Sequence, residues 1–137
     1  MKEYMQPKWW LIGVGTIFTI YTLLIYTETM DAAESGWGKG NVLAHDADYE
    51  KMWALHIMPL GVMAIGTGVF VSGKALAKMS MLAPSVVVII FAGMSALTGD
   101  NGYSSETPPF SAIALPLLTI VLTFTLGIAG YLHRDDE

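Results

Sequence analysis

The chain has 137 residues, of which 53% are hydrophobic and only 14% charged, and its formal net charge is −5. Soluble domains rarely combine so much apolar with so little charged sequence, so the composition argues against a soluble protein. The chain contains no cysteine. This excludes thiol redox catalysis, disulfide relay, iron–sulfur ligation and cysteine-ligated zinc within the chain itself.

Four stretches of the sequence lack Asp, Glu, Lys and Arg. Each runs for roughly 19 residues or more, the length that a helix needs to cross the hydrocarbon of a bilayer. Hydrocarbon offers no hydrogen bonds to backbone groups, so such stretches must be helical. We therefore predict an all-α membrane protein, a single domain over 1–137, with four transmembrane helices at about residues 9–27, 52–73, 79–99 and 110–132.

The first predicted span follows Lys2 and Lys8, an arrangement that secretory signals share. Its apolar run is longer than the usual core of a signal peptide. The segment TMDAAES that follows it offers no clean small-x-small cleavage site. We therefore expect residues 9–27 to be a retained anchor helix.

The first loop, residues 28–51, is the longest connection, and its segment ESGWGKGN has no hydrophobic periodicity. Connections longer than about 12–15 residues are usually functional or disordered. We predict an ordered outer loop. Trp37, which stands between two glycines, is predicted to anchor this loop on another subunit.

The segment AHDADYEKMWALHIMPLG leads from this loop into the second span and carries a histidine on each side of the boundary. Asp46 and Asp48 are expected to precede the helix and to accept hydrogen bonds from its free first-turn N–H groups. His45 lies in the polar part of the segment, where simple solvation is its expected role.

Within the second span, Met52, His56 and Met63 share one helical face. Imidazole and thioether groups are donors that suit copper(I). The structural alternative has His56 hydrogen-bonded to a threonine or a backbone carbonyl of an adjacent helix, with the methionines as packing. We favour the structural alternative and assign no metal ligand. If the chain did bind a metal, the candidate ligands would be His56, Met52, Met63 and His45.

The second span also carries the small residues Gly61, Ala64 and Gly68. The pair Ala64-x-x-x-Gly68 lets another helix backbone approach closely. Packing within the bundle is the commoner use of such residues, and an interface with another subunit is the alternative.

The two remaining connections differ in kind. The segment SGKALAKMS between the second and third spans is predicted to form a short hairpin, so these two spans should pack together. The segment TGDNGYSSETPPF before the fourth span is dense in turn formers and is predicted to be ordered but irregular.

The basic residues predict the orientation in the membrane. A cytoplasmic N-terminus places most of them inside, as the positive-inside rule requires: Lys2, Lys8, Lys74, Lys78 and Arg134. The C-terminus is then cytoplasmic too, and both acidic loops are extracytoplasmic. We expect a multi-pass protein of the plasma membrane.

Several functions fit the spans poorly. Ion-coupled carriers generally need an ionisable group at the membrane midplane, and none of the four predicted spans contains Asp, Glu, Lys or Arg. Haem held by two axial histidines needs a pair at similar depth. His56 is the only histidine inside a span, and His133 lies at the opposite face.

The layout of the whole chain, a short cysteine-free protein with four predicted helices and a long acidic outer loop, resembles the small accessory subunits of the archaeal copper ammonia monooxygenase and related membrane monooxygenases. This resemblance implies that larger subunits carry the copper and the catalysis while this chain braces the assembly. It assigns no ligand role to HDADYEKMWALHIM.

We therefore expect a noncatalytic accessory subunit of a multi-subunit membrane oxidoreductase. Its expected partners are larger membrane subunits and lipid, and other copies of the chain are further candidates. No nucleic-acid partner and no cofactor in this chain are expected, and copper would lie in the partner subunits. The alternatives are a small membrane transporter or channel, and a haem- or quinone-binding membrane protein.

Overall fold

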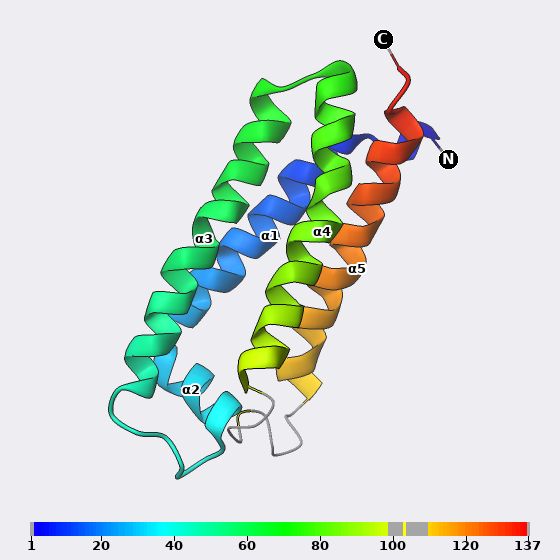
Figure 1. Ribbon diagram of the computed structural model, residues 1–137. Helices are drawn as coiled ribbons and strands as arrows, with labels where there is room; N and C mark the ends of the chain where they lie inside the picture. Colours follow the sequence, from blue (N-terminus) through cyan, green and yellow to red (C-terminus); the bar gives the residue numbers. More distant parts are fainter. Residues whose placement is uncertain (1, 99–102, 104–109, 137) are drawn as a thin grey trace.

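The structure is a computed structural model that describes residues 2–98, 103 and 110–136. Within these residues it is all-helical (Figure 1), with a short 3₁₀ turn and five α-helices: η1 (Lys2–Tyr4), α1 (Pro7–Thr27), α2 (Thr29–Trp37), α3 (Asp46–Phe70), α4 (Gly73–Thr98) and α5 (Phe110–His133). Four helical segments are long and apolar enough to cross a membrane: α1, α3, α4 and Pro116–His133 of α5. The prediction of an all-α protein with four candidate transmembrane helices is confirmed.

The long helices extend beyond the charge-free stretches. α3 begins at Asp46, six residues before the predicted start at Met52, and α4 begins at Gly73 rather than at Met79. The added residues include Ala, Leu, Lys and Glu, which are strong helix formers. A charged residue therefore marks the edge of the apolar stretch without ending the helix.

The predicted first loop contains a helix that the sequence reading missed. α2 has nine residues, TMDAAESGW, with Asp31 in its first turn. It ends at Trp37 and is capped by Gly38, whose φ of 87° lies in the left-handed region and whose N–H donates to the Glu34 carbonyl at 3.0 Å. The residues that α2 buries are Thr29, Ala33 and Gly36. Because they are small, they leave no pattern of large apolar residues.

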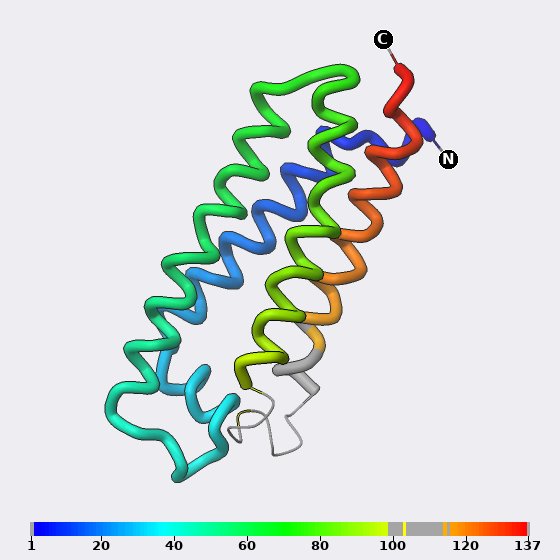
Figure 2. Tube along the Cα trace, viewed as in Figure 1, coloured from blue at the N-terminus to red at the C-terminus, as the bar shows by residue number. Residues whose placement is uncertain are grey.

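The long helices form two pairs, α1 with α3 and α4 with α5, and α1 also contacts α5 (Figure 1, Figure 2). The prediction that the second and third spans pack together was wrong, because α3 and α4 barely touch away from their link at residues 71 and 72. A short link makes two helices antiparallel neighbours, but the close-packing surfaces of α3 and α4 face α1 and α5 instead.

Glycine permits the close approach of α1 to α3. A Cβ at Gly61 would collide with the Thr19 hydroxyl and would lie 2.9 Å from the Gly15 carbonyl oxygen. A Cβ at Gly68 would lie 2.7 Å from Ile12 Cγ1, and one at Gly15 would lie 3.0 Å from the Ala64 Cβ. Gly61, Ala64 and Gly68 thus serve packing within the chain, the commoner of the two uses considered for them.

The second pair is built in the same way. A Cβ at Gly130 would lie 2.5 Å from the Ala77 carbonyl oxygen, and one at Gly127 would lie 2.5 Å from Pro84 Cγ. Ser80 is fully buried, and its hydroxyl donates to the Leu76 carbonyl at 2.9 Å within α4. The hydroxyl is therefore satisfied without a partner on α5.

The interior is narrow, and most large apolar side chains lie on the outside. Leu11, Leu76 and Leu126 form the buried hydrophobic cluster. By contrast, Ile89, Leu97 and many other large apolar side chains are exposed. Such a surface suits hydrocarbon rather than water, because a soluble monomer rarely exposes extended apolar patches.

The two ends of the bundle differ. α2 and the start of α3 lie at one end, called here the α2 end, and both termini lie with the α3–α4 link at the other, called the terminal end (Figure 1). The predicted irregular loop TGDNGYSSETPPF, apart from Thr98, Tyr103 and Phe110, lies outside the described residues.

Candidate functional site

The exposed face of α3 carries the residues that the sequence suggested as soft metal ligands. Met52 is 54% exposed and Met63 is 66% exposed, and His56 is also exposed. His56 Nδ1 lies 2.6 Å from the backbone oxygen of Met52, one turn earlier in the same helix. The expectation that His56 bonds to an adjacent helix was wrong, since its partner is its own helix.

This hydrogen bond determines which ring nitrogen of His56 carries the proton. A carbonyl oxygen can only accept, so Nδ1 donates and carries the proton. In neutral imidazole Nε2 then keeps its lone pair. Among the described residues Nε2 has no partner, so it is available to a group outside the chain. Metal-ligating histidines commonly donate their second ring nitrogen to a carbonyl in this way.

His45 lies apart from this face, at the boundary before α3. Its ring packs edge-on against Tyr49 with 5.3 Å between centroids, and Nε2 lies 3.6 Å from an Asp46 carboxylate oxygen. The side chain is 58% exposed, in keeping with the expected solvated role. Among the described residues no three or more His, Asp or Glu side chains form a group that could hold a metal ion.

Asp46 does not act as the sequence suggested. It lies in the first turn of α3 and is only 4% exposed, and its carboxylate accepts a hydrogen bond from the Leu43 N–H at 2.7 Å. The expected hydrogen bonds to first-turn N–H groups are replaced by one to the preceding loop. Asp46 therefore secures the loop against the start of α3, and its charge still complements the helix dipole.

A second cluster at the α2 end joins three segments. The Tyr103 hydroxyl donates to a Glu50 carboxylate oxygen at 3.0 Å, and the Tyr103 and Trp37 rings meet edge to face with centroids 5.2 Å apart. The Tyr103 ring also lies against Gly36, where a Cβ would overlap it. Trp37, predicted as an anchor on another subunit, is half-buried against its own chain, and its contact with another subunit stays a prediction.

The chemistry of Tyr103 follows from this setting. Burial raises the pKa of its hydroxyl, and the neighbouring Glu50 carboxylate raises that pKa further. Tyr103 therefore stays a hydrogen-bond donor at pH values where an exposed tyrosine ionises. Sequence reasoning missed Tyr103 and Glu50. The available signal was an aromatic residue isolated among turn formers, the same feature that drew attention to Trp37.

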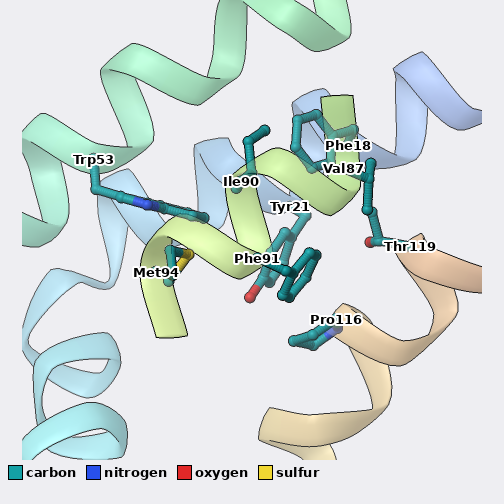
Figure 3. A pocket seen from close by; sticks show the side chains of 9 residues that line it. All are labelled: Phe18, Tyr21, Trp53, Val87, Ile90, Phe91, Met94, Pro116 and Thr119. Atoms are coloured by element: carbon teal, nitrogen blue, oxygen red, sulfur yellow. The ribbon is translucent and has the colours of Figure 1, made fainter. Parts of the chain in front are cut away.

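A small apolar cavity lies between the two helix pairs toward the α2 end (Figure 3). Its volume is about 80 Å³. Side chains from four helices line it, including Tyr21 of α1, Trp53 of α3, Phe91 of α4 and Pro116 of α5. Ligand pockets usually have volumes of about 300–1,000 Å³, so this cavity is too small for a haem or a quinone ring with its tail.

The four apolar helices, the exposed apolar surface and the glycine-packed pairs define a multi-pass membrane protein. Comparison with family models, curated proteins and solved structures gave no match to the chain.

Proposed function

We propose that this chain is a noncatalytic accessory subunit of a multi-subunit membrane complex, which it joins through the exposed face of α3. The observation that carries the proposal is His56, an exposed imidazole within a candidate membrane span. Its Nδ1 bonds to its own helix, and its Nε2 has no partner in the described part of the chain.

At the depth of His56 in the membrane, an imidazole that faces lipid without a hydrogen-bond partner is unfavourable in free energy. His56 lies five residues beyond Lys51 in α3, or about 7–8 Å deeper along the helix at 1.5 Å per residue. Hydrocarbon tails offer no hydrogen bond, and a polar group buried without one costs a few kcal/mol. A polar side chain from another subunit would remove this cost, and the flexible Met52 and Met63 would adapt to the shape of that subunit.

The kind of complex is proposed from the layout of the chain. A short chain with four helices and a long acidic loop suits an accessory subunit of a membrane oxidoreductase, with a copper-dependent ammonia monooxygenase as the specific proposal. Copper and catalysis would then belong to larger partner subunits. The small cavity at the α2 end gives no support to the haem or quinone alternative.

We also propose that the protein lies in the plasma membrane with both termini in the cytoplasm. The terminal end carries Lys2, Lys74 and Arg134, whereas the α2 end carries carboxylates such as Asp31 and Asp48. This distribution supports the orientation through the positive-inside rule.

The test is co-purification from native membranes in a mild detergent, with mass spectrometry of the intact assembly. His56→Leu should reduce the larger membrane proteins that co-purify with the chain by about tenfold, the effect of losing about 1.4 kcal/mol of binding. Ser95→Leu is the matched control, because Ser95 is an exposed polar residue on α4. It should leave co-purification unchanged.

Two outcomes would contradict the proposal. If His56 faces lipid, His56→Leu removes an unfavourable polar group, so the chain becomes more stable and its associations do not change. A wild-type chain that is extracted alone, with no larger membrane protein, would also overturn it.

A further inference from the structure

The terminal end holds a second hollow that the proposed function does not use. It is a groove of about 260 Å³ along the start of α1, closed on one side by α5. Its mouth is aromatic, formed by Tyr4, Trp9 and Trp10, and its deeper part is lined by Gly13, Ile17 and Leu122. We call it the α1–α5 groove.

Contacts between the two termini hold the mouth of the groove in place. Lys2 forms an ion pair with Asp136 at 2.5 Å, and His133 Nε2 donates to the Lys2 carbonyl at 3.1 Å. The N-terminal segment is thus attached to the end of α5. The Trp10 indole N–H donates to the Tyr4 carbonyl at 3.3 Å, so the aromatic wall is organised by hydrogen bonds as well as by packing.

Gly13 leaves the floor of the groove open. A Cβ at Gly13 would meet no atom within 4 Å, whereas a Cβ at Gly15 would lie 2.7 Å from the Gly61 carbonyl oxygen. Gly15 therefore serves contact between helices, and Gly13 does not. The missing side chain at Gly13 instead preserves free space beside Ile17.

A positively charged side chain, that of Lys8, lies at the mouth of the groove. The Lys8 ammonium group lies 5.5 Å from the centre of the Trp9 ring, within reach of a cation–π interaction. Lys2 is paired with Asp136, but Lys8 has no ion pair among the described residues. Lys8 is therefore available to an anion placed above the aromatic mouth.

We propose that the α1–α5 groove binds an anionic phospholipid, with one acyl chain along Gly13 and Ile17 and the phosphate at Lys8. From Trp9 to Ile17 the helix rises about 12 Å, close to the roughly 15 Å depth of one hydrocarbon leaflet. Trp and Tyr are the side chains that favour the level of the headgroups, and Trp9 and Tyr4 lie at that end of the groove. Charge and depth both match a lipid of the adjacent leaflet.

The experiment uses the full chain, purified in detergent and stripped of lipid. Dioleoyl phosphatidylglycerol or dioleoyl phosphatidylcholine is added, and native mass spectrometry counts the bound lipid. The wild-type chain should retain the anionic lipid about fivefold better, the ratio expected for one lysine near a headgroup. Lys8→Gln should abolish this preference while leaving the binding of phosphatidylcholine unchanged.

The groove itself is tested by filling it. Gly13→Leu should reduce the binding of both lipids, and Leu122→Trp should do the same from the α5 side. Gly93→Leu is the matched control. A Cβ at Gly93 also meets nothing within 4 Å, but Gly93 is an exposed residue of α4 away from the groove. Circular dichroism and size-exclusion chromatography establish that each variant keeps its helices and its size.

Three results would overturn the proposal. The first is equal retention of the two lipids by the wild-type chain. The second is unchanged retention in both groove-filling variants. The third is an equal loss in Gly93→Leu, which would show that lipid binds the whole apolar surface without selecting the groove.

Discussion

The Tyr103 hydroxyl donates to the Glu50 carboxylate at 3.0 Å, and this bond joins two residues separated by 53 positions in the chain. It attaches Tyr103, which lies between α4 and α5 in the sequence, to the first turns of α3. The Trp37 and Tyr103 rings meet edge to face with centroids 5.2 Å apart, so this tyrosine contacts both α2 and α3 at the α2 end.

Loss of this hydroxyl should weaken the α2 end. Tyr103→Phe keeps the ring contact with Trp37 but leaves the half-buried Glu50 carboxylate without its donor, at a cost of about 1–2 kcal/mol. Thermal unfolding in detergent should show the loss, and Tyr49→Phe is the control because Tyr49 is 60% exposed.

The sign of the pH dependence of stability follows from the raised pKa of Tyr103. Its contribution is complete below the ordinary tyrosine pKa of about 10 and declines progressively as the pH rises from there toward the raised pKa of the folded chain. Equal stability of the two variants would contradict the assignment.

Trp37→Ala tests the two roles of this tryptophan. The loss of its contact with Tyr103 should destabilise the isolated chain. If Trp37 also anchors the chain on another subunit, truncation should cost about 2 kcal/mol or more in binding. Tyr103→Ala removes the same internal contact, so it is the matched control. Co-purification that falls further in Trp37→Ala than in Tyr103→Ala supports the anchor, and equal losses contradict it.

Gly61→Ala should destabilise the α1–α3 pair. Its methyl group would collide with the Thr19 hydroxyl and press on the Gly15 carbonyl oxygen, and overpacking of this kind costs about 1–3 kcal/mol. Gly66→Ala is the control on the same helix, where the new methyl would meet only Phe70 at 3.9 Å. The control should be neutral or slightly stabilising because alanine is the better helix former. Equal melting temperatures for the two variants would refute the packing described here.

His56→Gln tests the structural role of His56 against a role as a metal ligand. Glutamine keeps hydrogen bonding but is a poor copper ligand, so we expect the intact complex to retain its metal content and activity. Metal analysis and an activity assay on the purified complex provide the measurement. Loss of copper from a complex that still assembles would instead make His56 a ligand.

The orientation is tested by single cysteines in a chain that has none of its own. Ser35 near the end of α2 and Ser72 in the α3–α4 link are both exposed. Ser35→Cys should react with an impermeant thiol reagent in intact cells, and Ser72→Cys should react only after the cells are opened. The reverse pattern would invert the topology. Ser80 is unsuitable as a reporter, because its burial would block labelling on either side.

The class of the protein follows from its amino-acid sequence alone. Its four charge-free stretches predicted four membrane-spanning helices because a helix is the only way for a single segment to satisfy its backbone in hydrocarbon. Local chemistry also placed Met52 and His56 on one face of the second helix, since that relation depends only on helical spacing.

The pairing of the helices and the partners of the polar residues depend on how the chain packs in three dimensions. The short link between α3 and α4 predicted that these two helices pack together. Instead, Gly61 lets α3 pack closely on α1, and Gly130 lets α5 pack closely on α4. Tyr103 meets Glu50 across 53 residues, a distance over which no local pattern extends. Small residues such as Ala33 concealed α2 for a related reason: contact through backbone and small side chains leaves no hydrophobic periodicity in the sequence.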